Sequence, residues 1–456
     1  MTRIWAEQAL LPSGWARDVA VELDAAGCIA SVADGQEPRA DDYRSGILLP
    51  APANAHSHAF QRAMAGLTES RGPDPRDSFW TWRKLMYRFL DRLDPDQVQA
   101  IAALVQMEML EAGYATNVEF HYLHHAPGGV PYDTLSEMAQ RIVAATNETG
   151  IGLTILPVHY RFGGCDGREL TAGQIRFGND PDRFARLVEE SRAALGALPD
   201  DARLGVAPHS LRAVTPEDIA RAPDLAQGGP LHMHLAEQVA EVEEVQAALG
   251  ARPVEWLLDN AQVDGQWCLI HCTQMQPHET EALAASGAVA GLCPITESSL
   301  GDGIFDGVRW LNADGRIAVG SDSNIRIALS EELRTLEYSQ RLRDRSRAAL
   351  ANAQASTGRR LFEAVCAGGA RASGRDSGRI APGALGDLVA LDAGHVDLTG
   401  QSGDILLDCW IFAGNDAMVR DVWSAGRHLV QGGRHHARDR ITAAYARAMA
   451  PLRGAL

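Results

Sequence analysis

The sequence predicts an α/β fold: a (β/α)8 barrel of the TIM type joined to a small β-sandwich domain that both ends of the chain form together. Three observations favour it. Eight apolar runs alternate with helix-patterned stretches, polar side chains follow the runs, and both chain ends carry strand-like segments. Strands that alternate with helices are typical of a parallel sheet with crossover helices, and eight such units close into a barrel. In order, the runs are residues 46–55, 115–120, 151–158, 202–208, 230–235, 266–270, 287–293 and 316–320.

The stretches between the runs have the period of helices. Residues 96–113, DQVQAIAALVQMEMLEAG, place apolar side chains three and four positions apart. The chain of 456 residues is 46% hydrophobic and 22% charged, which is enough apolar material for a large core. We therefore expect the barrel to occupy residues 48–377.

Both ends of the chain have strand character. Residues 19–32, VAVELDAAGCIASV, are two runs about a glycine, as in a hairpin. Residues 385–393 and 419–435 have a similar character near the other end. We expect residues 1–47 and 378–437 to form one composite β domain, and residues 438–456 to form a closing amphipathic helix.

Charge and composition exclude several classes of partner. The formal net charge of −17 repels nucleic-acid phosphates and anionic lipid surfaces. The opening residues lack a signal-peptide pattern, and no apolar run is long enough to span a bilayer. The seven scattered cysteines favour reduced thiols over a disulfide framework. We expect a cytoplasmic protein that binds neither nucleic acid nor membranes.

Polar side chains follow the runs at the places where a barrel holds its active site. In a (β/α)8 barrel, catalytic groups lie at the C-terminal ends of the strands. The side chains at these positions are His56, His58, Glu119, His121, Tyr122, His159, His209, Arg212, His234, Glu237, His271, Thr296, Glu297 and Asp322.

Four of these residues suit a catalytic metal ion. His56 and His58 alternate on one strand, so both imidazoles face one side. With His234 and Asp322 they form a set of nitrogen and oxygen ligands that zinc prefers and that leaves a position open for water. His232 shares a strand face with His234. We prefer His234, because Glu237 then lies near the water.

The same residues resemble the amidohydrolase superfamily, and the resemblance covers nearly the whole chain. Its members carry a His-x-His pair on the first strand, histidines on the fifth and sixth strands and an aspartate on the eighth. The resemblance implies that Glu237 shuttles protons and that His271 polarises the substrate or holds the attacking water. It also implies that Asp322 both binds the metal and accepts a proton.

The lysine content favours one metal ion over two. Binuclear members of that superfamily commonly bridge their metals with a carboxylated lysine at the end of the fourth strand. Lys84 is the only lysine of this chain, and it lies between the first two runs. We therefore expect one divalent ion, with zinc favoured over iron or manganese, and a deaminase rather than a ring-opening hydrolase.

The remaining polar residues indicate an acidic substrate. Guanidinium groups pair with carboxylates in a bidentate manner, so Arg83 and Arg212 suggest an acidic small molecule. Arg212 follows a barrel-end histidine by three positions, whereas Arg83 could equally be a surface charge. Gln61, Tyr122 and His209 are further polar candidates near the strand ends, although Gln61 and Tyr122 could equally be packing residues.

Five strings in order resemble the formimidoylglutamate deiminase family: NAHSHAFQRAMAGLTE, EFHYLHH, APHSLRAVTPE, HMHLAEQ and GSDSN. The resemblance implies hydrolysis of N-formimidoyl-L-glutamate, a small dicarboxylate, to N-formyl-L-glutamate and ammonia in histidine degradation, and a homodimer. It also implies that the glutamate moiety and the formimidoyl group are bound by Gln61, Arg83, Tyr122, His209 and Arg212. The rival hypothesis is another mononuclear deaminase that acts on guanine or a similar aminated ring. A non-catalytic metal-containing barrel is a third hypothesis, but it would not need Glu237 and His271 beside the metal ligands.

Overall fold

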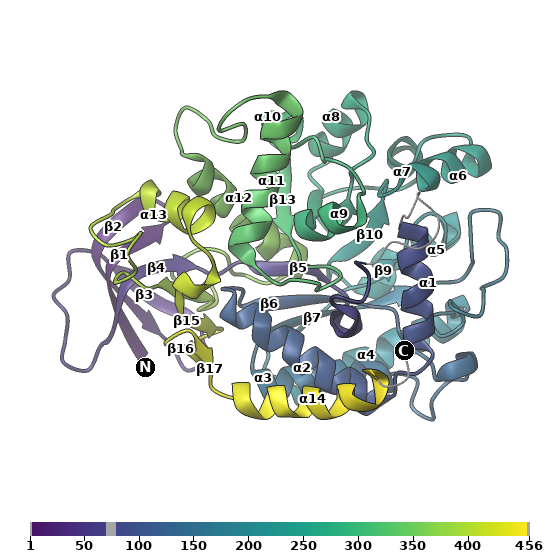
Figure 1. The fold of residues 1–456 in the computed structure, drawn as a ribbon, viewed down its shortest axis with the longest axis horizontal. Coiled ribbons are helices and arrows are strands. Elements are labelled where there is room, and N and C mark those ends of the chain that lie inside the picture. Colours follow the sequence, from purple (N-terminus) through teal and green to yellow (C-terminus); the bar gives the residue numbers. More distant parts are fainter. Residues whose placement is uncertain (1, 70–78, 454–456) are drawn as a thin grey trace.

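The structure, a computed structural model, describes residues 2–69 and 79–453 and confirms the predicted fold class. A barrel ringed by helices adjoins a sheet built from both ends of the chain (Figure 1). The barrel strands are β5 (Ala53–Ser57), β6 (Thr116–His121), β7 (Gly152–His159), β8 (Arg203–Leu204) with β9 (Ala207–Pro208), β10 (Leu231–Leu235), β11 (Trp267–His271), β12 (Val289–Leu292) and β13 (Arg316–Val319).

The barrel strands are parallel and close into a ring. One sheet has the order β5-β6-β7-β8, with β9 also paired to β7, and a second has the order β10-β11-β12-β13. Parallel bridges between Val206 and Leu231 and between Ser57 and Asp322 join the two sheets. At the second seam, the His58 N–H donates to the Asp322 carbonyl at 2.9 Å. This seam therefore brings the start and the end of the barrel segment together at the candidate metal ligands.

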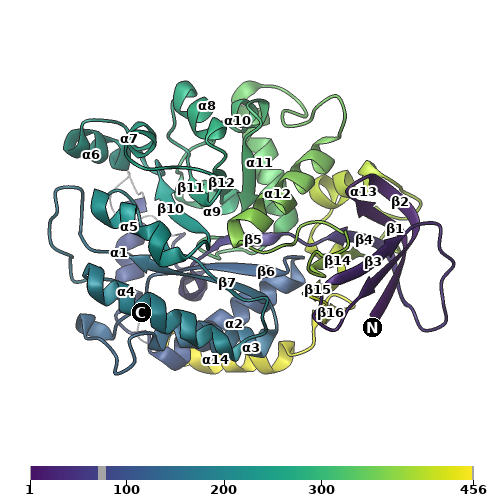
Figure 2. The same cartoon turned by 180° about the vertical axis from the view of Figure 1, so that it is seen from behind.

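Helices connect the strands and cover the outside of the barrel (Figures 1 and 2). Their starts follow from the sequence. For α2, the Asp94 side chain accepts from the Gln97 N–H, and the Gln97 side chain accepts from the Asp94 N–H. Pro95 occupies the first helical position. The connecting helices are α1 (Phe79–Leu90), α2 (Pro95–Glu111), α3 (Glu137–Thr149), α4 (Pro181–Ala194), α5 (Pro216–Ala226), α6 (Val239–Leu249), α7 (Pro253–Asn260), α8 (Pro277–Ala285), α9 (Pro294–Leu300), α10 (Gly307–Asn312), α11 (Leu329–Asp344) and α12 (Thr357–Ser373), with short 3₁₀ turns η1 (Ala59–Met64), η2 (Pro127–Gly129) and η3 (Leu195–Ala197).

Both chain ends contribute to one eight-stranded sheet in the order β17-β16-β15-β14-β4-β1-β2-β3. Its own apolar core includes Ile4, Val21, Leu388 and Trp423, all at most 2% exposed. The predicted hairpin is present, because β2 and β3 pair in the antiparallel direction. The strands are β1 (Thr2–Leu11), β2 (Gly14–Leu23), β3 (Ile29–Ala33), β4 (Tyr43–Pro50), β14 (Leu388–Leu391), β15 (Val419–Ser424), β16 (Arg427–Gln431) and β17 (Arg434–His435), with α13 (Asp404–Asp408), η4 (Cys409–Ala413) and η5 (Asp416–Met418) between them.

The first predicted run contains parts of two strands. Its beginning belongs to β4, which pairs with β1 and with β14 and so joins the two chain ends in one sheet. Its end belongs to β5, the first barrel strand. The expected boundary between residues 47 and 48 falls inside β4, and the division into domains stays a prediction.

The predicted closing helix is α14 (Arg438–Arg453), which lies along α2 at the edge of the barrel (Figure 1). Residue 1 and residues 454–456 of the predicted segments lie outside the described residues. All seven cysteines lie in the described part of the chain and are free thiols. Among the described helices, none combines the length and the apolar character that a membrane crossing requires.

One buried histidine of the terminal sheet is held in its neutral form. The His435 ring donates from Nε2 to the Thr149 carbonyl at 2.9 Å and accepts at Nδ1 from the Ala437 N–H at 3.1 Å. Burial lowers the pKa of His435 to about 4. Protonation of Nδ1 would remove the acceptor that the Ala437 N–H uses.

Candidate active site

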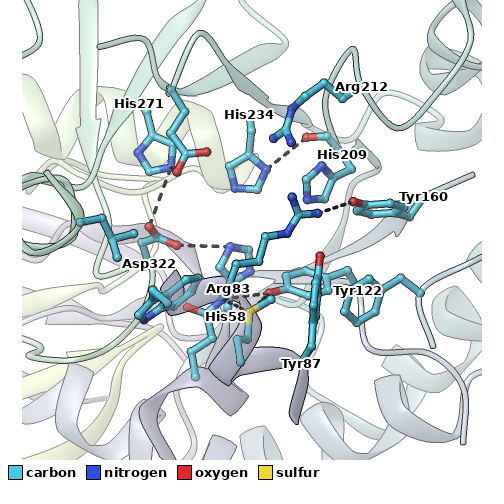
Figure 3. A pocket seen from close by; sticks show the side chains of 16 residues that line it. His58, Arg83, Tyr87, Tyr122, Tyr160, His209, Arg212, His234, His271 and Asp322 are labelled. Carbon is cyan, nitrogen blue, oxygen red and sulfur yellow. Dashed lines mark hydrogen bonds and ion pairs between the residues drawn. The ribbon is translucent and has the colours of Figure 1, made fainter. Parts of the chain in front are cut away.

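The four candidate metal ligands converge at the C-terminal ends of the barrel strands. His56 lies on β5 and His58 directly follows it, His234 lies on β10, and Asp322 follows β13. The Nε2 atom of His56 lies 3.2 Å from the Nε2 atoms of both His58 and His234. Asp322 Oδ1 lies 3.2 Å from His58 Nε2 and 3.5 Å from His56 Nε2. Figure 3 shows His58, His234 and Asp322 around one point.

The donor set fits a tetrahedral cation. The His58 Nδ1 atom lies 3.0 Å from the Phe120 carbonyl and the His234 Nδ1 atom 3.1 Å from the His209 carbonyl. Because a carbonyl can only accept, each Nδ1 carries the proton and each Nε2 presents a lone pair. Ligand atoms about 2.1 Å from a tetrahedral zinc ion lie about 3.4 Å from one another, which agrees with the spacing found here.

Burial keeps the three imidazoles of this cluster in the form that binds a metal. His56, His58, His234 and Asp322 are at most 6% exposed. Burial lowers the pKa of His58 to about 3 and holds the pKa values of His56 and His234 well below the usual range. The imidazoles are therefore neutral near pH 7, which is the form that binds a metal.

The backbone around the ligands is tightly constrained. Asp322 and His271 have φ values of 45° and 72°, a region that non-glycine residues rarely adopt. A Cβ atom on Gly320 would lie 2.5 Å from the His56 backbone nitrogen, so only glycine allows this close approach of β5. The GSDSN segment thus fixes how Asp322 meets the histidine pair.

His271 and Glu237 adjoin the metal cluster. His271 Nε2 lies 4.0 Å from Glu237 Oε1 and 3.8 Å from Asp322 Oδ2. On its other side, Nδ1 lies 3.2 Å from Glu297 Oε1, which also accepts from the Cys293 N–H. Burial alone lowers the pKa of His271, but these three carboxylates outweigh it and raise the pKa to about 10. The three carboxylates therefore favour the doubly protonated, cationic form of the ring.

A pocket opens beside the cluster, and both predicted arginines line it. Arg83 projects from α1 and donates to the Tyr160 hydroxyl at 3.0 Å. Arg212 is 8% exposed, and its Nε atom has no hydrogen-bond partner among the described residues. Aromatic rings of Trp82, Tyr87, Tyr160 and Phe177 complete the wall. All the predicted substrate-binding residues line this pocket, namely Gln61, Arg83, Tyr122, His209 and Arg212.

Other predicted barrel-end residues have different surroundings. His232 donates to the Ala372 carbonyl at 2.8 Å and lies outside the ligand group. His159 stacks on Phe184, with 4.3 Å between the ring centroids. Glu119 accepts from the Ala59 N–H at 2.7 Å and so supports the segment after His58. His121 and Thr296 are also buried away from the described lining of the pocket.

The sequence pattern indicates no specific role for Glu297 and does not distinguish Tyr160 from its neighbours. Glu297 had a signal, because it follows the seventh run, but only the folded chain shows that it contacts His271. Tyr160 follows His159 at the end of the third run, and the tertiary structure turns its side chain into the pocket. The stretch FWTWRK, which supplies Arg83, begins at residue 79, directly after residues outside the described part.

Together these groups can perform hydrolysis. A divalent cation held by the three imidazoles and the aspartate would lower the pKa of a water molecule and supply a nucleophile near neutral pH. Glu237, His271 and Asp322 surround the place where protons would move. The two arginines line the same pocket, where they can bind the anionic end of a small molecule.

Comparisons with known proteins agree with this arrangement. A model of the amidohydrolase family matches residues 47–429, and a model described as the N-terminal domain of formimidoylglutamate deiminase HutF matches residues 1–46. The chain is 47% identical to formimidoylglutamate deiminase of Pseudomonas aeruginosa over 456 residues, which covers 99% of this chain and 100% of that protein.

Solved structures show the same fold. The crystal structure of an amidohydrolase from Brucella melitensis has a TM-score of 0.95 and 48% identity, and the match covers 99% of this chain and 100% of that one. An adenosine deaminase from Xanthomonas campestris with bound zinc has a TM-score of 0.83 at 21% identity, with coverage of 99% and 98%. The second likeness extends to the fold alone.

Proposed function

Because this chain belongs to the amidohydrolase family, we propose that it is a metal-dependent hydrolase that converts N-formimidoyl-L-glutamate and water to N-formyl-L-glutamate and ammonia in histidine degradation. One observation carries the proposal. The pocket beside the three-imidazole and aspartate cluster is also lined by two arginines, Arg83 and Arg212. This substrate has both an electron-poor C=N carbon for the hydrolytic side and two carboxylates for the arginine side.

His56, His58, His234 and Asp322 hold one divalent ion in this proposal, and zinc is the preferred metal. The close match between their mutual distances and a tetrahedral zinc site supports this choice. The presence of a single lysine in the chain supports one ion rather than a lysine-bridged pair.

Three side chains handle the protons. Water adds to the formimidoyl carbon, the bond from that carbon to the terminal nitrogen breaks, and a C=O bond replaces the C=N bond. Asp322 accepts one proton from the water as it attacks, and the second proton leaves the hydroxyl group as the C=O bond forms. Glu237 passes these two protons to the terminal nitrogen, which departs as ammonia. His271, held by Glu297, donates toward the reacting centre and stabilises the negative charge that develops on the oxygen.

The part of the pocket that the arginines line binds the glutamate portion. Arg83 and Arg212 pair with carboxylates, and His209 lies beside His234, with 4.9 Å between the ring centroids (Figure 3). Gln61 donates to the Tyr122 hydroxyl at 2.8 Å, so these two side chains act as one polar unit beside His58. This unit contacts the formimidoyl group.

The proposal includes a homodimer, supported by the family likeness, and a cytoplasmic location, supported by the free cysteine thiols. Ammonia release by metal-replete protein tests the activity, with N-formimidoyl-L-glutamate, guanine and cytosine as parallel substrates. We expect brisk release from the first alone. Release from either base but not from N-formimidoyl-L-glutamate would refute the proposed substrate.

A further inference from the structure

Tyr160 lies in the pocket on the side of the arginines. It directly follows β7, is 3% exposed, and its ring centroid lies 4.4 Å from that of His209. In Figure 3 its hydroxyl group faces Arg83, on the side away from His271 and Asp322. None of the roles proposed above uses this hydroxyl group.

Two donors occupy the oxygen of this hydroxyl group. Arg83 Nη2 donates to it at 3.0 Å, and Gln174 Nε2 donates to it at 2.8 Å. The orientation of the Gln174 amide is fixed, because its Oε1 atom accepts from the Thr171 N–H at 3.0 Å and from the Thr171 hydroxyl at 2.9 Å. The nitrogen of that amide must therefore point toward Tyr160.

Because two donors already bind the Tyr160 oxygen, the hydroxyl hydrogen must find an acceptor elsewhere. A phenolic hydroxyl has one hydrogen to donate and can accept two hydrogen bonds. Arg83 and the Gln174 nitrogen have no lone pair to offer in return, so neither can take the hydrogen. No residue in the described part of the chain accepts a hydrogen bond from Tyr160. The hydrogen is left to point into the pocket that the side chain lines.

We propose that Tyr160 is a substrate-binding residue that donates its hydroxyl hydrogen to the carboxylate that Arg83 pairs with. Two adjacent cationic groups, Arg83 and Arg212, make an anionic oxygen the favoured acceptor. Gln174 is then a positioning residue, because it holds the hydroxyl in its donating orientation. The inference rests on the proposed function and adds a specificity contact to it.

The test is steady-state hydrolysis of N-formimidoyl-L-glutamate by the zinc-loaded Tyr160→Phe variant. Loss of a hydrogen bond to a charged group raises KM about ten- to one-hundred-fold, while kcat changes less than about threefold because the carboxylate takes no part in the chemistry. Tyr43→Phe removes a hydrogen-bonded phenol in the terminal sheet and serves as the matched control, with KM unchanged. An unchanged KM in Tyr160→Phe would overturn the inference.

The same substitution in the Arg83→Met variant distinguishes a direct contact between Tyr160 and the substrate from an effect that acts through Arg83. If Tyr160 only positions Arg83, then Tyr160→Phe has no further effect once Arg83→Met is present. We expect KM to rise again, by at least about threefold, in the double variant. No further rise would contradict direct donation. Absence of activity in the wild-type protein would instead refute the proposed function, so the two failures are distinguishable.

Discussion

Arg212→Met removes the buried guanidinium that we assign to a substrate carboxylate. Arg212 follows β9 and precedes α5, and its side chain lines the pocket. Burial alone lowers the pKa of the guanidinium, but the neighbours Glu241, Tyr160 and Glu237 outweigh burial and raise it. The group is therefore cationic throughout the working pH range.

The size of the effect follows from that burial. Loss of a charge-assisted hydrogen bond in a buried pocket costs about 2–3 kcal/mol, and each 1.4 kcal/mol is about tenfold in binding. KM for N-formimidoyl-L-glutamate should thus rise about 30- to 150-fold. Because the carboxylate is bound equally in the ground state and the transition state, kcat should change less than about threefold.

The assay is ammonia release across a range of substrate concentrations. Arg221→Met, which changes an exposed arginine of α5, is the matched control and should keep the wild-type KM. Arg212→Lys should recover part of the affinity, because a point charge remains while the bidentate geometry is lost. A KM within twofold of wild type in Arg212→Met would refute the assignment and favour an uncharged substrate such as an aminated ring.

Other changes probe the rest of the account. Glu237→Gln cannot transfer a proton, so kcat should fall about 10²- to 10⁴-fold with little change in KM, and a retained kcat would contradict its role. Gly320→Ala places a Cβ atom 2.5 Å from the His56 backbone nitrogen, so zinc affinity in a chelator competition should fall at least about tenfold, whereas Gly196→Ala, with open space around it, should bind normally. The free energy of unfolding should fall as pH drops from 6.5 toward 4, because the unfolded chain protonates His435 more readily than the folded chain. The free energy of unfolding, measured by urea titration at several pH values, should depend less steeply on pH in His435→Gln. Equal pH dependence in the two proteins would exclude a contribution from His435.

The convergence of the four candidate metal ligands and most of the pocket lining were predictable from the sequence, because both depend on strand order and spacing. His56 and His58 share a strand face by alternation, and a (β/α)8 barrel brings the ends of β5, β10 and β13 to one rim. Asp322 needs only the position of the last run. The backbone topology places side chains at strand ends, and the apolar runs of the sequence predict that topology.

Contacts that depend on loops and on side-chain direction were not predictable in the same way. The hydrogen bonds to Tyr160 join a strand end to a loop residue 14 positions away, Gln174, and to a helix residue 77 positions away, Arg83. The division of the first run between β4 and β5 is visible in the sequence as two prolines. Pro50 and Pro52 lack the N–H groups that a continuous central strand needs, and they mark the change from one sheet to the other.

The central claim is one divalent ion held by His56, His58, His234 and Asp322. Anomalous diffraction from crystals of zinc-loaded protein, collected on both sides of the zinc absorption edge, tests it most directly. The account predicts one peak per chain, within bonding distance of all four side chains. Two peaks in the pocket, or a single peak away from these four residues, would contradict it.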